Sequence, residues 1–180
     1  PRMSRSNLES PFKLTGLGLL QEAQRQGQGV VLAMCHYGRP IMLSTCLGVS
    51  GLEIGMLSQT IDERNQHLNS VERSYLSWKM KRAVEIAGGR WLMLDDSMRP
   101  LYSGLMAGEM IIVMFDLEEH KPANRLVAPF FGGEMTIPRG IERLATRTGA
   151  KIVYGVARDK GRIVEVDLCE LPPDPREALV

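Results

Sequence analysis

The stretch "VVLAMCHYGRP" (residues 30–40) brings a histidine, a glycine and an arginine together directly after a continuous apolar run. Histidine suits general-base catalysis because its ordinary pKa lies near neutrality. Gly38 permits a positive φ or a close backbone approach, and Arg39 carries a planar guanidinium that suits phosphate. His36, Gly38 and Arg39 are therefore the first candidates for a site. The alternative is a histidine that only caps a loop by hydrogen bonding.

Cys35 adjoins His36, but the spacing argues against a cysteine–histidine pair. Neighbouring residues of a strand point to opposite faces, so Cys35 should face away from the imidazole and is interpreted as a small core residue. Cys35, Cys46 and Cys169 have no metal-like spacing. Three unpaired cysteines are typical of reduced thiols in a cytosolic protein. We expect no metal site and no cofactor.

Strand-like and helix-like segments alternate around these residues. Apolar runs predict strands at 30–34, 52–57, 90–94 and 109–115. Apolar residues at helical spacing, bounded by Pro or Gly, predict helices at 16–26, 40–49, 97–107 and 138–150. A charged amphipathic stretch runs from 62 to 87. The polar, Pro- and Gly-containing segment 116–134 is interpreted as a loop. Lys160-Gly161 separates two strand-like runs, which is a hairpin signal.

This alternation predicts an α/β fold with a largely parallel central sheet, flanking helices and a C-terminal antiparallel hairpin at one edge. The length of 180 residues predicts a single domain over 1–180. His36 falls just past the C-terminal end of a predicted parallel strand. Open α/β sheets bind their ligands at that edge, so we expect His36 at the mouth of a cleft.

Composition and charge restrict the partners. A net charge of +1 argues against a dedicated nucleic-acid binder. No run of about 20 apolar residues could span a bilayer, and no signal peptide is visible. The opening "PRMSRSN" reads like the interior of a longer chain. These features favour a cytoplasmic protein.

One predicted helix, around 70–87, mixes basic and apolar residues. Its members are Arg73, Tyr75, Leu76, Trp78, Lys79, Met80, Lys81 and Arg82. Such a mixture suits an anionic membrane surface, here the cytoplasmic face of the inner membrane, or an acidic carrier protein. The alternative is the charged face of an ordinary amphipathic helix.

Three stretches, in order, carry a resemblance that runs from about Phe12 to Pro172. They are "LQEAQRQGQGVVLAMCHYG", "GEMIIVMFD" and "APFFGGEMTIPRGIERLATRTGAKIV". With them the chain resembles the bacterial lipid A biosynthesis (lauroyl/myristoyl) acyltransferases, within the lysophospholipid and glycerophosphate acyltransferase superfamily. The last stretch is the most specific, because it joins a rare apolar tetrapeptide to a patterned helix. We expect the N-terminal anchor region of the family to lie outside residues 1–180.

The resemblance implies transfer of a fatty acyl group from an acyl carrier protein or coenzyme A thioester to a hydroxyl, without a covalent enzyme intermediate. His36 matches the family's general base. The family motif continues with a carboxylate five residues later, and Ile41 stands at that position. Arg39 stands where an asparagine is common, and a family arginine has no clear match in "GMLSQTID".

Other residues are therefore candidates for the missing carboxylate. The resemblance favours Asp116, at the end of a predicted strand, as the second catalytic residue; a loop or cap role is its alternative. Further candidates are Asp95, Asp96, Glu118 and Glu119.

The resemblance also implies substrate-binding residues. Phe130 and Phe131 would shape an acyl groove near His36, with a loop anchored to the core as the alternative. Arg139 and Arg143 would bind the phosphate of a phosphopantetheine or head group near a helix N-terminus. A solvated helix face is the alternative for Arg143.

Three functions stay open at this point. The first is acyl transfer from an acyl carrier protein or acyl-coenzyme A to a hydroxyl of a lipid or small molecule. The second is a related enzyme that acylates or condenses something other than lipid A, such as an amine or a carrier-bound intermediate. An amine needs less basic assistance and would tolerate the loss of the carboxylate. The third is a non-catalytic relative that binds lipid or carrier protein.

Overall fold

The computed structural model describes residues 12–116, 124–130 and 132–171. Its strands are β1 (Phe12–Thr15), β2 (Val30–Met34), β3 (Ile54–Ser58), β4 (Gly88–Met93), β5 (Met110–Met114), β6 (Arg125–Phe130), β7 (Gly133–Pro138), β8 (Lys151–Lys160) and β9 (Ile163–Leu171). Its helices are α1 (Leu17–Arg25), α2 (Pro40–Val49), α3 (Ser70–Ala87), α4 (Arg99–Met106) and α5 (Gly140–Thr148). No helix within these ranges is long and apolar enough to cross a membrane.

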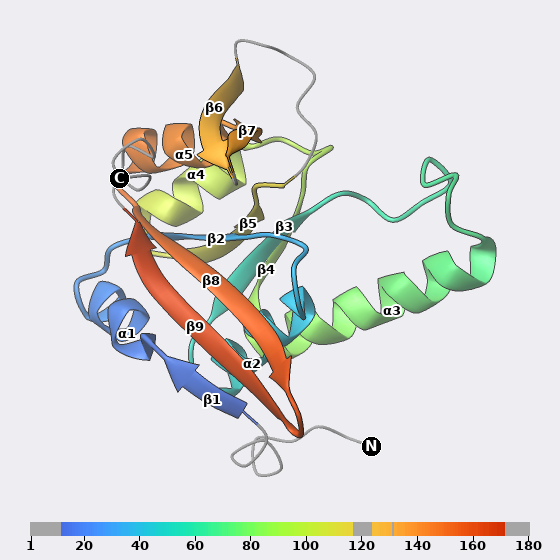
Figure 1. Ribbon diagram of the computed structural model, residues 1–180, viewed down its shortest axis with the longest axis horizontal. Coiled ribbons are helices and arrows are strands. Elements are labelled where there is room, and N and C mark those ends of the chain that lie inside the picture. The colour runs from blue at the N-terminus through green and yellow to red at the C-terminus, as the bar shows by residue number, and fades with distance from the viewer. Residues whose placement is uncertain (1–11, 117–123, 131, 172–180) are drawn as a thin grey trace.

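The described strands form one sheet of seven, in the order β1-β9-β8-β2-β5-β3-β4, and a separate pair, β6-β7 (Figure 1). In the large sheet every neighbouring pair is parallel except β8 with β9. The predicted α/β fold with a largely parallel sheet is confirmed. The expected edge position of the β8–β9 hairpin is wrong, because β1 pairs with β9 and covers that edge.

Both faces of the sheet are covered, so β2 is buried along its whole length. Alternate side chains of β2 enter different cores because successive residues point to opposite faces. Leu32 packs in the cluster that contains α1 and α2 residues, and Val31 packs with residues of α4 and α5. A continuous apolar strand is the sequence pattern that such two-sided burial requires.

β2 and β5 are neighbours in the sheet, and the connections that leave them run in opposite directions across it. The helix after β2 is α2, which packs on one face. The helix after β5 is α5, which packs on the other face. The chain therefore diverges above the C-terminal ends of these two strands, and this topological switch point is where open α/β sheets form a ligand crevice.

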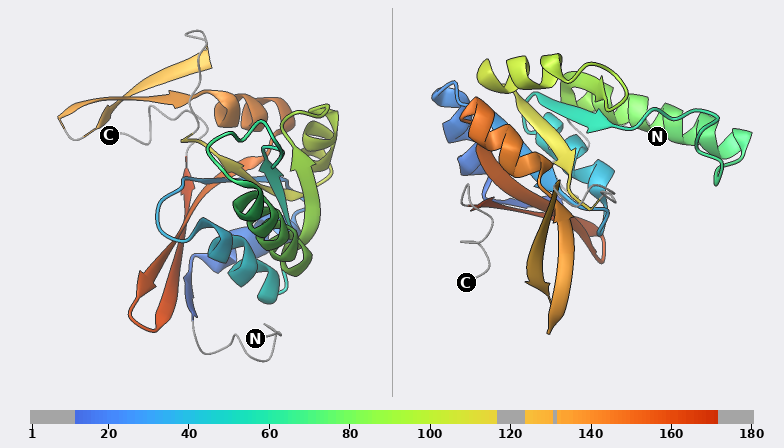
Figure 2. Two further views of the ribbon diagram at one scale, coloured as in Figure 1. Left: turned by 90° about the vertical axis from the view of Figure 1, so that its right-hand side faces the viewer. Right: turned by 90° about the horizontal axis from the view of Figure 1, so that it is seen from above.

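Helix α3 packs against α2 at its C-terminal half and extends beyond the sheet at its N-terminal half (Figures 1 and 2). The close crossing of the two helices needs Gly48, since a Cβ there would lie 2.4 Å from the carbonyl oxygen of Ile86. The helix begins at Ser70, in agreement with the predicted helix around 70–87, and Asn69 and Glu72 fix its start with a reciprocal capping box. The segment 59–69 before it is irregular.

Two sequence predictions fail around the β6–β7 hairpin. Residues 125–130 and 133–138 pair as antiparallel strands and were expected to be mostly loop. Pro138 ends β7, whereas it was expected to open the following helix; α5 begins at Gly140. One segment contains a proline and the other ends with one, and proline argues against a strand when only the sequence is considered. The hairpin stands apart from the large sheet (Figure 2).

Candidate active site

His36 and Asp116 meet at the switch point, just beyond the ends of β2 and β5. The backbone N–H of His36 donates to Asp116 Oδ2 at 2.6 Å, and the ring nitrogen Nδ1 lies 2.9 Å from Asp116 Oδ1. The side chains are 59% and 32% exposed. An ionised carboxylate only accepts hydrogen bonds, so in the neutral imidazole this contact requires the proton on Nδ1 and leaves the lone pair on Nε2. Nε2 has no hydrogen-bond partner among the described residues.

The loop between β2 and α2 is anchored on β8. Gly38 has a φ of +71°, and a Cβ at this position would lie 2.2 Å from the carbonyl oxygen of Ala157. The next residue, Arg39, donates its backbone N–H to the same oxygen at 2.8 Å. Glycine is required at position 38 both for the positive φ and for the close approach to the Ala157 carbonyl. The contact fixes the turn that directs the His36 ring.

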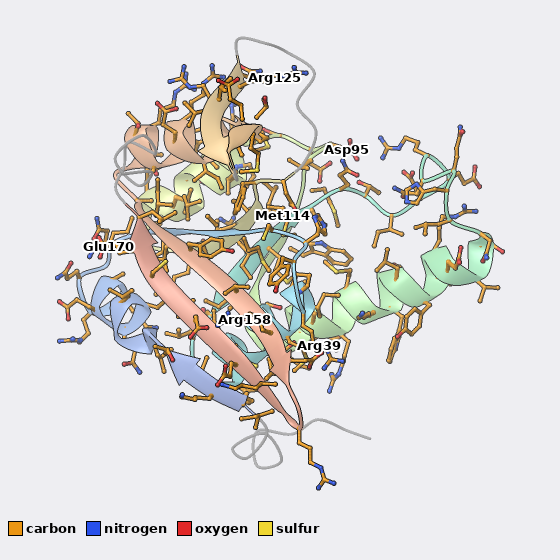
Figure 3. The ribbon with its side chains drawn as sticks, viewed as in Figure 1. Arg39, Asp95, Met114, Arg125, Arg158 and Glu170 are labelled. Carbon is orange, nitrogen blue, oxygen red and sulfur yellow. The ribbon has the colours of Figure 1, made fainter. Side chains whose placement is uncertain are left out.

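The Arg39 guanidinium is held by β8 and does not line the cleft described below. It pairs with Asp159 of β8, with its Nε 3.2 Å from Oδ2. Figure 3 shows Arg39 beside the β8–β9 hairpin. The phosphate-binding role of Arg39 stays a prediction, but in this conformation its charge is already partnered.

A cleft of about 380 Å³ opens beside His36 on the α2–α3 face of the sheet. Its floor is formed by strand residues that include Met34, Met56, Ile112 and Met114. Leu76 and Met80 of α3 line its wall, and the irregular segment 59–68 closes its far side. The lining is predominantly apolar. The His36 imidazole thus stands at the entrance to a predominantly apolar cleft.

The family assignment follows from a match over most of the chain. Residues 1–165 match the family model for the bacterial lipid A biosynthesis acyltransferase. The chain belongs to that family. A search of curated proteins finds no match. The membership confirms the family that the motifs around His36, Asp116 and the "PFFGG" stretch indicated.

Within this acyltransferase fold, Ile41 lines the cleft near the start of α2. An apolar side chain here extends the apolar lining up to the histidine. It cannot orient an imidazole. In the described residues the carboxylate that contacts His36 comes instead from Asp116, 80 residues along the chain.

The other candidate carboxylates are engaged elsewhere or are not described. Asp95 accepts a hydrogen bond from Arg64 at 2.9 Å, and Arg64 also pairs with Asp62. Hydrogen bonds from Thr60 and then Arg64 hold the pKa of Asp95 below its ordinary value. Asp96 shows no contact with His36, and Glu118 and Glu119 lie outside the described residues. Asp95 therefore fastens the segment 59–68, which lines the cleft, through Arg64.

The arginines expected to bind phosphate lie on the other face of the sheet. Arg139 forms two hydrogen bonds of 2.8 Å to Glu142 and lines a smaller apolar cavity of about 130 Å³ beneath the β6–β7 hairpin. Arg143 donates to Asn124 at 2.5 Å. Neither arginine lines the cleft beside His36. Phosphate binding by this pair stays a prediction.

The prediction that Phe130 and Phe131 shape an acyl groove concerns side chains that lie outside the described part of the structure. Phe131 is not among the described residues, and for Phe130 only the strand backbone of β6 is described. An apolar cleft does start beside His36, but its described walls come from β2, β3, β5, α2, α3 and the segment 59–68.

The cysteines occupy separate environments. Cys35 lies 3.7 Å from the Tyr154 hydroxyl, and residue 154 faces the cavity beneath β6–β7. Burial, together with the contact to Cys35, raises the pKa of Tyr154 to about 12. Burial likewise raises the pKa of the Cys46 thiol to about 11. In the described ranges no three His, Cys, Asp or Glu side chains cluster as metal ligands do.

Sequence reasoning missed the contribution of segment 59–68 to the cleft. Thr60, Ile61, His67 and Leu68 all line it. The segment is polar and irregular, and it gave no periodic signal. Its position depends on the contact between Arg64 and Asp95, which are 31 residues apart.

Proposed function

We propose that this acyltransferase-family protein moves a fatty acyl group from an acyl carrier protein or coenzyme A thioester to a hydroxyl or amine acceptor, with His36 as the general base. The proposal rests mainly on the contact between His36 Nδ1 and Asp116 Oδ1 at 2.9 Å. That contact leaves Nε2 as the basic nitrogen at the mouth of the apolar cleft.

The chemistry begins with the acceptor. Nε2 of His36 removes the proton from the acceptor hydroxyl or amine as its oxygen or nitrogen attacks the thioester carbonyl carbon. The tetrahedral intermediate then collapses with cleavage of the carbon–sulfur bond. The departing sulfur takes the proton from the imidazolium, which returns His36 to its neutral form. The acyl group passes directly to the acceptor, and no covalent enzyme intermediate forms.

Asp116 acts through His36 in this scheme. Its carboxylate holds Nδ1 protonated, which keeps the lone pair on Nε2, and it stabilises the imidazolium that forms during the reaction. A second hydrogen bond, from the His36 backbone to Oδ2, fixes the carboxylate relative to the ring. A family member with Ile41 at the motif position can thereby retain an oriented base.

The cleft supplies the affinity for the acyl chain. Each CH₂ group that leaves water contributes about 0.8 kcal/mol, and the lining from Met34, Ile41 and Met80 offers such an environment. Pro40 and Ile41 also place the N-terminal end of α2 at the cleft. The positive end of that helix dipole favours the negative charge that develops on the thioester oxygen.

The test is release of free thiol by the purified protein from acyl-carrier-protein and acyl-coenzyme A donors, with a panel of hydroxyl and amine acceptors. We expect His36→Ala to lower turnover by about 10²–10⁴-fold. Met106→Ala is the control, because Met106 is an exposed residue of α4 that does not line the cleft. It should retain turnover within a few-fold.

The acceptor panel also separates the remaining functions. Turnover with hydroxyls identifies the first function, and turnover with amines alone identifies the second. If wild type and His36→Ala give the same background with every donor and acceptor, His36 is not a catalytic base. The protein would then be a non-catalytic relative that binds lipid or carrier protein.

A further inference from the structure

The outer face of α3 carries an exposed apolar stripe. Val71, Tyr75 and Trp78 follow one another at helical spacing and are 75%, 60% and 62% exposed. The rings of Tyr75 and Trp78 lie against each other, with centroids 6.0 Å apart. The other large apolar side chains exposed in the described residues, Tyr37, Met106 and Val127, belong to different elements. A gathering of this kind on one helix marks an interaction surface.

Basic residues flank the stripe on both sides. At about 100° of rotation per residue, Lys79 and Lys81 fall on opposite sides of the line through Val71, Tyr75 and Trp78. Neither lysine forms an ion pair with a described residue. The charge of Arg82, which continues the stripe, is balanced by Glu85 at 2.9 Å. Glu72 of the capping box adds one negative charge near Val71, so the two lysines leave the surroundings of the stripe with a net positive charge.

The opposite face of α3 belongs to the cleft. Leu76 and Met80 line it, and Ala83 and Ala87 are buried. The helix thus separates the apolar cleft beside His36 from the exposed stripe, and its N-terminal half projects beyond the sheet (Figure 2).

We propose that the outer face of α3 docks on an anionic lipid bilayer, with Tyr75 and Trp78 at the headgroup level and Lys79 and Lys81 over anionic headgroups. Tyrosine and tryptophan favour that interface because each ring is apolar at one end and polar at the other. An apolar stripe bordered by lysines is typical of helices that lie in the plane of a membrane. Lysines on both sides of the stripe match the planar array of charges on a membrane surface. A compact acidic protein would favour basic residues on one side of the stripe only.

Trp78 itself can report on the docking. Trp91 donates a hydrogen bond to Ser58 within the fold, and Trp91→Phe leaves Trp78 as the single tryptophan of the chain. With vesicles of phosphatidylcholine and phosphatidylglycerol we expect a blue shift of the Trp78 emission that saturates with lipid. Pure phosphatidylcholine vesicles should bind more weakly, and added salt should weaken binding to the anionic ones. Vesicle co-sedimentation of the wild-type chain measures the same binding without the Trp91 substitution.

Paired variants test which residues carry the binding. Lys79→Ala and Lys81→Ala should each weaken binding to anionic vesicles about 5-fold, and Trp78→Ala should weaken it at least as much. Lys13→Ala with Arg162→Ala removes two exposed charges elsewhere, and Met106→Ala removes an exposed apolar side chain from α4. These controls should bind as wild type does. Matching thermal unfolding of all variants excludes loss of the fold as the cause.

Three results would overturn the proposal. The first is wild-type protein that does not bind anionic vesicles, and the second is α3 variants that bind them as tightly as the controls do. The third is loss of binding to an acyl carrier protein in the lysine variants with vesicle binding unchanged, which would assign the face to the carrier. None of these measurements depends on catalysis by His36, so failure here is distinct from failure of the proposed acyl transfer.

Discussion

The carboxylate of Asp116 holds His36 at two points, its backbone N–H at 2.6 Å and its ring Nδ1 at 2.9 Å. The two residues are 80 positions apart in the chain. They meet because β2 and β5 are adjacent parallel strands and each residue lies just past the end of its strand. The predictions below follow from this pair and from the cleft that it borders.

Asp116→Asn should lower kcat by about 10²–10⁴-fold while the protein stays folded. The amide keeps the shape of the side chain but cannot stabilise an imidazolium, and its NH₂ group favours the wrong tautomer of His36. Because both side chains are partly exposed, the change in the free energy of unfolding should stay below about 1 kcal/mol. Steady-state kinetics and chemical denaturation of the same preparation provide the two values. A large loss of stability with normal kcat would contradict the assigned role.

Gly38→Ala should destabilise the protein and reduce activity together. The left-handed backbone conformation costs a non-glycine residue about 1–2 kcal/mol, and the new Cβ would also clash with the Ala157 carbonyl. Gly161→Ala is the matched control, since Gly161 has a φ of +65° and open space around it. The control should show the backbone cost alone in urea denaturation. Equal destabilisation at both positions would mean that the contact with β8 is not tight.

The length of the acyl chain should determine kcat/KM until the cleft is filled. Each added CH₂ should raise kcat/KM about 4-fold, which corresponds to about 0.8 kcal/mol. Met80→Trp should narrow the cleft and shift the optimum to shorter chains, whereas Met106→Trp on α4 should not. A homologous series of saturated acyl donors measures this. If kcat/KM does not depend on chain length in either the wild type or Met80→Trp, the acyl group binds elsewhere.

The segment 59–68 should loosen in acid. The pKa of Asp95 is lowered in the folded protein by its hydrogen bonds with Thr60 and Arg64. A lowered folded-state pKa gives a stabilisation that is present above the unfolded value of about 3.9 and is lost as the pH falls through the folded value. Hydrogen exchange of residues 59–68 should therefore be slow at pH 5–7, after correction for the intrinsic rate, and faster below about pH 4.

Arg64→Ala tests the same contact at neutral pH. It should make exchange in 59–68 fast already at pH 7, and Arg82→Ala, which breaks the α3 pair with Glu85, should not. Unchanged protection in Arg64→Ala would mean that the segment is held by its apolar residues alone.

The core of the fold was predictable because its signals are local. The runs "VVLAM" and "EMIIVMF" are continuous and apolar, and both strands are buried on two faces. The position of His36 followed directly from the end of the first run. β1 was missed because "FKLT" has only four residues and gains its place by pairing with β9, more than 140 residues later.

The site was less predictable because it depends on long-range pairing. Local pattern placed both His36 and Asp116 at strand ends, but only the strand order makes those ends adjacent. The family resemblance favoured Asp116 over Asp95, and the contact with Arg64 explains why Asp95 is not available. The walls of the cleft from 59–68 had no sequence signal, since an irregular polar segment has no periodicity.

A double-mutant cycle on His36 and Asp116 tests the central claim most directly. The initial rates of thioester cleavage with the best acceptor would be measured for wild type, His36→Ala, Asp116→Asn and the double variant. If Asp116 acts through His36, the two losses are not additive, and the double variant should be as slow as His36→Ala alone. If the losses multiply, so that Asp116→Asn slows His36→Ala as much as it slows wild type, the two residues act independently and the account of the site is wrong.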